Sequence, residues 1–465
     1  MRITTLLFLL VLLSGMNLFG QNVYIPDANF KSYLVGNVEV NTNGDTAIQV
    51  SEASSFNGYL ECDYQNISDL TGIEAFVNLS ALDVGNNLLQ SLNLSQNVAL
   101  QDLSCDNNFL SILDVSEHHV LSSLKCDDNQ LTVLNLNGAS LEYLYCDDNL
   151  LTALDLTQNV FLRSLECDDN FLLSLDISQN TALSSLKCDD NQLTMLNLNG
   201  AALEYLYCDE NLLTTIDLSE NIYLRTLECD NNFLSSLDVS QNTALSSLKC
   251  DDNQLTVLNL NGVALEYLYC YDNLLTTLDL SQNVFLRTLE CDNNFLSSLD
   301  VSSNNALSSL KCDDNQLTAL NLNGAALEYL YCYDNLLTTL DVSQNPSLSH
   351  LDCHNNQLSC LNVANGSNIG MYEFYVNYNP NLACIEVDDA AWSAANWTEI
   401  DAQTSYSEDC NNDCSNTSSL TELTTSKNLV QILDLIGRET SFKPNKPLIY
   451  VYDDGSIDKV FSVEY

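Results

Sequence analysis

A block of 62 residues recurs almost unchanged through the middle of the chain. It begins with LSSLKCDD at Leu121 and returns at Leu183, Leu245 and Leu307. Inside each block the shorter pattern L-x-x-L-x-C-x-x-N-x-L returns three times, after 20, 21 and 21 residues. A single coil of that length has nothing against which to bury its leucines, so the coils must stack on one another. The sequence therefore predicts a solenoid.

The residues of one coil, LEYLYCDDNLLTALDLTQNVF from Leu141, indicate how it is built. Leu141, Leu144 and Cys146 have the spacing of a short strand and the turn that follows it. Asn149 occupies the place where leucine-rich repeats, which this pattern resembles, have an inward-pointing amide that hydrogen-bonds the backbone of the turn. A buried turn needs such a partner for its peptide groups. The second half of the coil, 151–159, repeats the same spacing, so we expect strands on both sides. No segment of the repeats has helical periodicity long enough for a regular convex helix, which favours a flattened, β-rich solenoid.

The L-x-x-L-x-C-x-x-N-x-L pattern resembles the nested bacterial leucine-rich repeat of about 21 residues. The resemblance covers residues 79–368 and implies a β-rich leucine-rich repeat solenoid of about 16 coils, each of 20–21 residues. An open stack would expose a whole coil of leucines, so both ends need caps. IPDANFKSYLVGN is expected to form a short helix at the first end, and Trp392 and Trp397 a helical cap at the second. Both flanks resemble the caps of secreted leucine-rich repeat proteins from the Bacteroidetes.

The two termini differ from the repeats. MRITTLLFLLVLLSGMNLFG combines a charged start, an apolar run and a small residue before Gln21, which is typical of a secretory signal peptide. No later stretch is apolar enough to span a bilayer, so we expect no transmembrane segment after signal cleavage. LDLIGRE followed by PLIYVYDDG resembles the C-terminal sorting domain of type IX secretion substrates. That resemblance implies the type IX secretion machinery as a partner and a location outside the outer membrane.

These features divide the chain into six parts. They are a signal peptide (1–20), an N-terminal cap with a degenerate first coil (21–78), the repeats (79–368), a last coil with the C-terminal cap (369–410), a linker (411–426) and the sorting domain (427–465). The linker is polar and lacks the repeat periodicity. The sorting domain has alternating apolar runs around an Asp454–Gly455 turn, so we expect it to be a small β-domain.

Cysteine is frequent, and its positions suggest how it is used. The chain has 18 cysteines, which in an exported protein normally indicates a disulfide scaffold. Thirteen of them, from Cys105 to Cys353, hold one inward position of successive coils, where in-register neighbours are poorly placed for bridging. We predict that these are buried free thiols. The candidates for disulfides lie in or beyond the terminal coils: Cys360, Cys384, Cys410 and Cys414. Cys384 with Cys410 is the preferred pair, because it would staple the C-terminal cap.

The formal net charge is −49, which excludes nucleic acid as a default partner because phosphate binding needs the opposite sign. Much of this charge comes from an Asp–Asp pair after the cysteine, as at Asp127 and Asp128 or at Asp147 and Asp148. Two like charges stacked about 4.8 Å apart repel by roughly 0.9 kcal/mol in water. The columns are either a solvated acidic edge or a place where divalent cations bind, and charge runs of this kind favour the first.

The residues beside the inward leucine and cysteine are expected to face out from a concave sheet. Their sets alternate so that paired tyrosines return every three coils, roughly 14 Å apart. Glu142 is expected to face Arg163, and Glu166 to face Lys187. The candidate binding residues are Tyr143, Tyr145, Arg163, Tyr205, Tyr207, Arg225, Tyr267, Tyr269, Arg287, Tyr329 and Tyr331. Aromatic rings beside charges and hydroxyls can stack on sugars or hold a repetitive protein, but tyrosines and charged pairs also suit any half-exposed strand.

One stretch of the N-terminal cap has the spacing of a calcium-binding EF-hand loop. Oxygen-bearing side chains hold the first, third, fifth and twelfth positions: Asn41, Asn43, Asp45 and Glu52. Thr46 stands where the sharp turn needs glycine, and Asn41 replaces the usual aspartate. The loop is therefore either a calcium site or a polar Asn–Gly turn. No other cofactor is expected to be required.

The sequence contains no nucleophile with a base, no phosphate-binding loop and no carboxylate pair in a recognisable pocket, so we do not expect an enzyme. We expect an exported, adhesin-like binding protein, secreted or held at the cell surface. Its concave face would engage an extracellular protein or a polysaccharide. The alternative is a rigid acidic spacer without a dedicated ligand.

Overall fold

The computed structural model describes residues 21–411, 414, 429–433, 447–452 and 457–461. The chain divides into two compact units, Met1–Glu408 and Asp409–Tyr465. The predicted signal peptide lies outside the described residues, as does most of the predicted linker.

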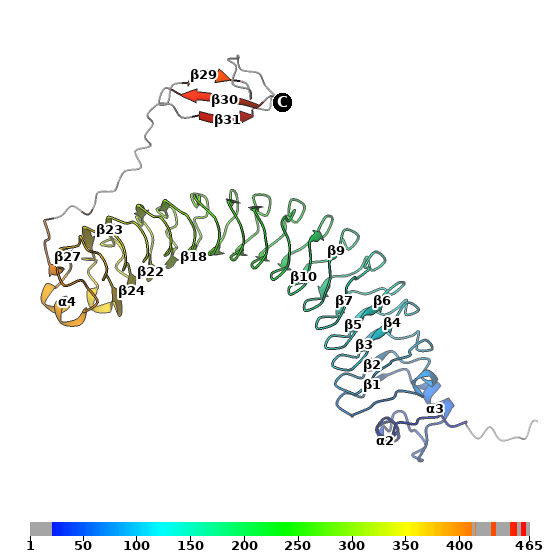
Figure 1. Ribbon diagram of the computed structural model, residues 1–465. Coiled ribbons are helices and arrows are strands. Elements are labelled where there is room, and N and C mark those ends of the chain that lie inside the picture. The colour runs from blue at the N-terminus through cyan, green and yellow to red at the C-terminus, as the bar shows by residue number, and fades with distance from the viewer. Residues whose placement is uncertain (1–20, 412–413, 415–428, 434–446, 453–456, 462–465) are drawn as a thin grey trace, which may run out of the picture. The chain divides into compact units, whose positions relative to one another are not determined.

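The first unit is a stack of coils whose short strands form one parallel sheet of 16 strands. Every strand is three residues long, and its middle residue is paired in register with the middle residues of its neighbours. The strands, in order across the sheet, are β1 (Tyr59–Glu61), β2 (Ala81–Asp83), β3 (Asp102–Ser104), β5 (Ser123–Lys125), β7 (Tyr143–Tyr145), β8 (Ser164–Glu166), β10 (Ser185–Lys187), β12 (Tyr205–Tyr207), β13 (Thr226–Glu228), β15 (Ser247–Lys249), β17 (Tyr267–Tyr269), β18 (Thr288–Glu290), β20 (Ser309–Lys311), β22 (Tyr329–Tyr331), β24 (His350–Asp352) and β26 (Glu373–Tyr375). This sheet lines the inner, concave side of the curved stack (Figure 1), and the predicted β-rich solenoid is confirmed.

The outer side of the coils also carries strands, but they form only small sheets. Four pairs and one group of four are present: β4 (Ile112–Asp114) with β6 (Val133–Asn135), β9 (Ser174–Asp176) with β11 (Met195–Asn197), β14 (Ser236–Asp238) with β16 (Val257–Asn259), β19 (Ser298–Asp300) with β21 (Ala319–Asn321), and β23 (Thr339–Asp341), β25 (Cys360–Asn362), β27 (Cys384–Glu386) and β28 (Ser405–Ser407). Strands on both sides are thus confirmed. The outer ladder breaks after each 20-residue coil of the repeated blocks, whose loop turns at a glycine with positive φ, as at Gly138 (φ 88°).

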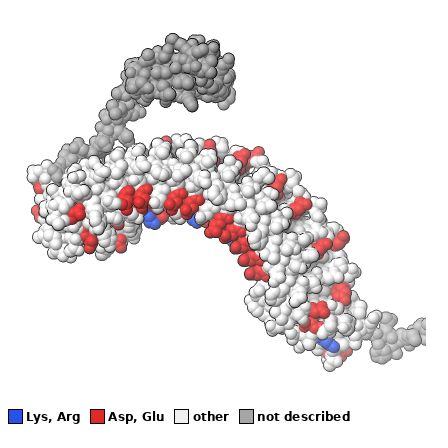
Figure 2. Space-filling model, in the orientation of Figure 1, with Lys and Arg blue, Asp and Glu red and all other residues white. Residues whose placement is uncertain are grey.

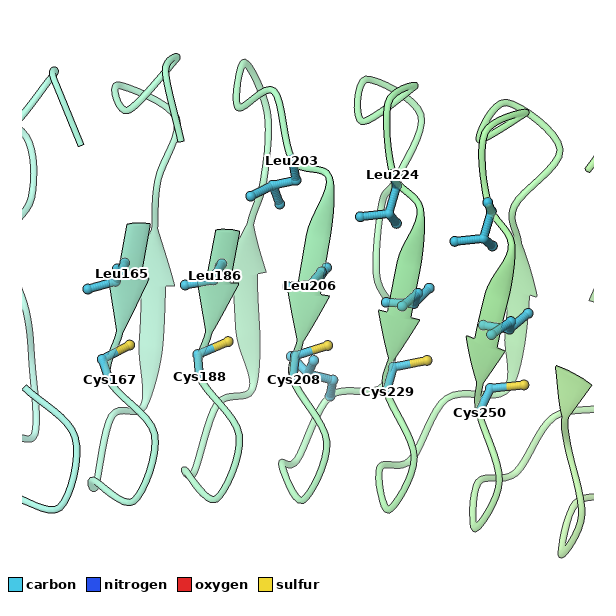
Figure 3. Packing of buried hydrophobic residues seen from close by; sticks show 14 of the residues in the cluster. Leu165, Cys167, Leu186, Cys188, Leu203, Leu206, Cys208, Leu224, Cys229 and Cys250 are labelled. Atoms are coloured by element: carbon cyan, nitrogen blue, oxygen red, sulfur yellow. The ribbon is translucent and has the colours of Figure 1, made fainter. Parts of the chain in front are cut away.

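The core is a set of leucine columns with one column of cysteine. The middle leucine of each inner strand points into the coil, and the cysteine that follows it points toward the next coil (Figure 3). From Cys62 to Cys353, 14 cysteines are buried free thiols, which confirms the prediction for the ladder. The Cys167 thiol lies 3.4 Å from the Lys187 carbonyl oxygen of the next coil, a distance that suits a weak S–H donor. Burial raises the pKa of the Cys167 thiol well above its usual value, so the reactive thiolate is disfavoured.

Each coil also buries an asparagine that fixes the turn after the inner strand. The Asn149 side chain donates hydrogen bonds to the carbonyl oxygens of Cys126, Cys146 and Asp147, at 3.0, 3.3 and 2.9 Å. Its own oxygen accepts the backbone N–H of Leu131 at 2.9 Å. The inward amide predicted for this position is therefore confirmed, and it links each coil to the preceding one.

Short helices and loops cover both ends of the stack. At the N-terminal end are α2 (Ala28–Gly36), α3 (Val50–Ser55) and η1 (Ile73–Ala75), and at the other end are η2 (Asn368–Gly370) and α4 (Ala390–Asn396). Trp397, the residue after α4, stacks on Phe374 with ring centroids 4.1 Å apart, and Trp392 meets it edge-on at 5.5 Å. In the described part of the chain, every helix is too short or too polar to cross a bilayer.

The second unit contains three antiparallel strands, β29 (Leu429–Leu433), β30 (Pro447–Tyr452) and β31 (Ile457–Phe461). They agree with the small β-domain expected from the sequence.

The four cysteines singled out for bridging, Cys360, Cys384, Cys410 and Cys414, are each disulfide-bonded. Leu361 and Ile385 are in register between β25 and β27, so Cys360 and Cys384 are neighbours across that pair. The pair Cys384–Cys410 stays a prediction.

Candidate binding face

The predicted tyrosines lie in two columns on the concave sheet. In the first column, Tyr205 stands in register between Ser185 and Thr226; in the second, Tyr207 stands between Lys187 and Glu228. Tyrosines of the first column recur at every third strand from β7 onward and are 38–41% exposed: Tyr143, Tyr205, Tyr267 and Tyr329. Those of the second column are half-buried: Tyr145, Tyr207, Tyr269 and Tyr331. The rings of the first column are flanked by small side chains in most coils, whereas Tyr329 stacks on His350 at 4.6 Å.

Each predicted arginine on this face has a glutamate partner in the preceding coil. Arg163 contacts Glu142 at 2.9 Å, and the other two pairs, Arg225–Glu204 and Arg287–Glu266, have the same geometry at 3.0 Å. The Lys187–Glu166 contact is 3.1 Å. The two contacts predicted from the first block are therefore confirmed. The arginine side chains are 59–61% exposed, so each pair contributes little to stability but neutralises the middle of the face.

The Asp–Asp pairs after the cysteines contain two different kinds of aspartate. A row of acidic residues follows the inner edge of the curve (Figure 2). The aspartate directly after the cysteine is half-buried or buried there in most coils. In six coils its Oδ1 atom has no hydrogen-bond partner among the described residues, and in the last two of these asparagine follows it: Asp127, Asp168, Asp189, Asp251, Asp230 and Asp292. Burial, together with the neighbouring aspartates, raises the pKa of Asp147 to about 7 and that of Asp209 to about 6.

The second aspartate of each pair is present for a conformational reason. Asp148 and Asp169 both have φ 48°, and the equivalent position is left-handed in every coil of the repeats. Aspartate and asparagine tolerate this region better than other non-glycine residues. Asn231 and Asn293, each with φ 50°, replace aspartate at the same position. The pair is therefore not a simple run of charge. Its first aspartate has a raised pKa because it is partly buried, and its second aspartate adopts the left-handed conformation that the turn needs.

Two groups on this edge bring three carboxylates together. One oxygen from each of Asp147, Glu166 and Asp168 lies within 4.8 Å of the others, and Asp209, Glu228 and Asp230 repeat the arrangement one block later. A lysine already contacts each group, at 3.1 Å from Glu166 and at 3.0 Å from Asp230. In the third block Tyr271 replaces the first carboxylate.

The loop with EF-hand spacing is closed by its own hydrogen bonds. Glu52 accepts the backbone N–H groups of Thr42 and Gln49, at 2.9 and 3.0 Å. The Asn41 oxygen accepts the N–H of Gly44, and one Asp45 oxygen accepts the N–H of Ala47. The Asn43 oxygen accepts the N–H of Asp45. Each of the four predicted calcium ligands thus accepts a hydrogen bond from a backbone N–H group. Calcium binding at this loop stays a prediction.

A hollow that the sequence did not predict lies at the N-terminal end of the concave sheet. It has a volume of about 390 Å³ and spans β1, β2, β3, β5 and β7, with Tyr59 at one side and Tyr145 at the other. The buried Leu82 and Leu103 and the small Ala81 contribute apolar surface to it. Tyr59, at one side of the hollow, could have been found from the sequence, because YLEC at 59–62 repeats the spacing of YLYC at 143–146.

Charged groups line the same hollow. Asp83 and Asp102 contribute carboxylates and Lys125 an ammonium group. The Tyr59 hydroxyl donates a hydrogen bond to Asp83 at 3.2 Å. Lys125 is directed to the acidic edge, with its Nζ atom 3.2 Å from Asp106 and 3.8 Å from Asp127.

Comparison with known proteins agrees with this architecture. No protein-family model and no curated protein matches the chain. The solved functional domain of InlJ from Listeria monocytogenes, which includes a cysteine ladder, is 30% identical; the match covers 74% of this chain and 77% of that domain, with a TM-score of 0.56. A leucine-rich repeat protein from Leptospira interrogans is 21% identical, with 77% of this chain and 97% of that chain covered and a TM-score of 0.57. This chain belongs to the leucine-rich repeat proteins.

A third leucine-rich repeat structure shows the same fold at lower similarity. The effector protein YopM from Yersinia pestis is 22% identical, with 79% of this chain and 95% of that chain covered and a TM-score of 0.51. The buried thiols between Cys62 and Cys353 are a further likeness to the InlJ domain, since that domain also includes a cysteine ladder. The leucine-rich repeat assignment explains the inward leucines and asparagines, but it leaves open what the outward tyrosines contact.

Proposed function

We propose that the protein is an exported, adhesin-like surface protein without catalytic activity, which binds an extended partner along its concave face. A polysaccharide or another surface protein would fit this description. The observation that supports it most is the return of an exposed tyrosine at every third strand of one continuous sheet, from Tyr143 to Tyr329. Because several weak contacts add when ligand and site share a period, such an array suits a repetitive or extended partner better than a small molecule.

The surroundings of the tyrosines support the same proposal. Tyr205 lies between Ser185 and Thr226, whose short side chains leave the ring accessible and offer hydroxyl groups beside it. The nearby glutamates and arginines neutralise one another, so the middle of the face does not require a charged partner. Concave surfaces of solenoid proteins commonly bind partners in this way.

The test is binding of the mature full-length chain to a glycan array and to surface-protein extracts. Changing Tyr143, Tyr205, Tyr267 and Tyr329 to alanine should reduce binding at least tenfold, because the contacts of one array are lost together. A matched control removes exposed apolar side chains from the outer strands at Val133, Met195 and Val257, and should leave binding unchanged. Equal binding by the tyrosine variant would remove the array from the proposal.

Export is proposed separately from binding. Deleting residues 427–465 should leave the protein in the periplasm, because the segment resembles a type IX sorting domain. The melting temperature of the solenoid should not change, since residues 1–408 form a compact unit of their own. Surface display of the truncated chain, measured by protease accessibility on whole cells, would contradict the sorting assignment.

The alternative function is a rigid acidic spacer. The Glu–Arg contacts support it, because groups that already satisfy one another on a sheet need no ligand. A spacer should tolerate both the tyrosine variant and the outer control equally, whereas a binding protein should not.

A further inference from the structure

We propose that the hollow between Tyr59 and Tyr145 is a separate pocket for a basic side chain, presented by an extended segment of a partner protein. The inference rests on the proposed function and deepens it by naming the chemistry of the partner. It concerns the N-terminal end of the concave sheet, from β1 to β7 (Figure 1), where β7 carries Tyr143, the first tyrosine of the array.

The charges of the hollow favour a cation. Lys125 also lines the hollow, but its Nζ atom lies 3.2 Å from Asp106 and 3.8 Å from Asp127, so these two carboxylates offset its charge. Asp83 and Asp102 have no lysine or arginine within ion-pair distance in the part of the chain that the structure describes. In the array, by contrast, Glu142, Glu204 and Glu266 are each paired with an arginine. The hollow therefore offers two carboxylates, those of Asp83 and Asp102, to a cationic group of a partner.

The walls of the hollow suit the rest of a basic side chain. The faces of Tyr59 and Tyr145 can attract a lysine ammonium or an arginine guanidinium group through cation–π contacts. Ala81 and the rings of Tyr59 and Tyr145 offer apolar surface along which the methylene stem can lie, whereas the buried side chains of Leu82 and Leu103 point into the coils. A volume of about 390 Å³ is at the lower end of the range for ligand pockets and is suited to one long side chain.

The position of the hollow gives it a role that the array cannot have. Tyr59 and Tyr143 are four strands apart in the same column, with Ala81, Asp102 and Ser123 between them. From Tyr143 onward the tyrosines are three strands apart. A uniform array would accept an extended partner in several equivalent registers. A distinct pocket at one end fixes a single register, because only one basic residue of the partner can occupy it.

The test uses the mature full-length chain and three synthetic peptides: lysine–serine, glutamine–serine and glutamate–serine repeats. Asp83→Asn with Asp102→Asn removes both carboxylates; the amide oxygen introduced at position 83 can still accept the Gly85 N–H, and its NH₂ group can donate to the Tyr59 hydroxyl oxygen. The matched control is Asp148→Asn with Asp169→Asn, which removes the same charge at left-handed positions that asparagine tolerates. Fluorescence anisotropy gives the affinities, and melting curves verify that both variants fold.

We expect the lysine peptide to bind the wild-type chain and the other two peptides to bind at least tenfold more weakly. The hollow variant should lose about tenfold in affinity for the lysine peptide, as expected when charge-assisted contacts are lost, and the control less than threefold. Equal losses in the two variants would mean that only the overall negative charge attracts the peptide, and would overturn the proposal. Tighter binding of a cationic amino-sugar polymer than of the peptide would also overturn it, in favour of a polysaccharide.

A second comparison separates this proposal from the one on which it rests. If the four-tyrosine variant binds the lysine peptide normally while the hollow variant does not, the pocket stands and the array fails. If the tyrosine variant loses binding while the hollow variant keeps it, the pocket fails and the array stands.

Discussion

In the coil that begins at Leu162, Asn170 turns the inner half and Asn180 turns the outer half, and both are buried. The oxygen of Asn170 accepts the N–H of Leu151, and its NH₂ group donates to three carbonyl oxygens, including that of Cys146. Asn180 donates to the carbonyl oxygens of Leu156 and Asn159, while its own oxygen has no partner among the described residues. The inner amide is fully satisfied and the outer one half satisfied.

The aspartates show the opposite difference: ionisation is unfavourable in the inner half and favourable in the outer half. On the inner edge, burial raises the pKa of Asp189 to about 7. In the outer half, a hydrogen bond from the backbone N–H of Ser178 lowers the pKa of Asp176. The inner half therefore uses its amides for stability and tolerates unfavourable charges at its edge. The outer half has unbonded amide oxygens but well-solvated, hydrogen-bonded carboxylates. The continuous sheet coincides with the inner half, which suits that half to carry the binding face.

Replacing each of the two asparagines by alanine should show the difference in stability between the inner and outer turns most clearly. Asn170→Ala should lower the free energy of unfolding by about 3–5 kcal/mol, because a backbone N–H and three carbonyl groups lose their partner in a buried turn. Asn180→Ala should cost about 1–2 kcal/mol, because it removes two hydrogen bonds together with an oxygen that was already unpartnered. Urea denaturation followed by circular dichroism measures both. Equal losses would show that the two turns are equivalent in stability.

Changing the pH should affect the two halves in opposite directions. Inner aspartates such as Asp147 and Asp292, whose pKa is raised to about 7, bind more protons in the folded state than in the unfolded state between about pH 4 and pH 7. Their contribution to stability is therefore lost as the pH rises through this window. Outer aspartates such as Asp155 and Asp238, whose pKa is lowered, contribute stability that is lost as the pH falls below about 4. The melting temperature should be highest near pH 4 to 5 and fall by several degrees toward pH 8.

Variants show which half causes each side of that profile. Asp147→Asn, Asp189→Asn and Asp292→Asn together should flatten the alkaline side and leave the acid side in place. Asp176→Asn with Asp238→Asn should flatten the acid side alone. A profile that the first variant leaves unchanged would mean that the inner column does not titrate in this range.

A smaller effect is expected at Glu210, which occupies the left-handed position with φ 47°. The side-chain contact with Asp190 raises the pKa of Glu210, so the ionised glutamate is unfavourable at this position. Glu210→Asn should raise the free energy of unfolding by about 0.5–1 kcal/mol, because asparagine tolerates this conformation better. Asp190→Asn is the control, since it removes a charge at the equivalent position without changing the conformational preference. Equal gains from both would assign the effect to charge alone.

Calcium should have the smallest effect. The oxygens of the EF-hand-like loop already accept hydrogen bonds, as those of Glu52 show, so calcium and sodium at the same ionic strength should shift the melting temperature equally. A calcium-specific shift that Asp45→Ala abolishes would assign a site to the loop. One that survives Asp45→Ala would point to the inner aspartate column.

Much of the repeat could be predicted from the sequence, because every inward position recurs many times. Cys146 and Asn149 occupy fixed places in one pattern, and a buried place in one coil implies the same place in all. The left-handed position was also visible in principle, since Asn231 replaces aspartate there. The hollow could not be predicted, because it depends on residues that occur at one place in the stack and do not recur. The hollow arises where the coils of Ala81 and Asp102 lack the tyrosines of the array, and a periodic pattern gives no information about its own interruptions.

The register of the inner sheet has a consequence for how the protein can vary. β10 and β15 carry the same Ser–Leu–Lys triplet, so if residues 183–244 were removed, β8 would pair with β15 through the contacts it now makes with β10. Loss or gain of one block by exchange between the near-identical gene segments would create no new interface and leave both caps in place. The number of tyrosine sites, and with it the valency for a repetitive ligand, would change in whole steps. Under the binding function proposed above, such a change would alter avidity without altering a single contact residue.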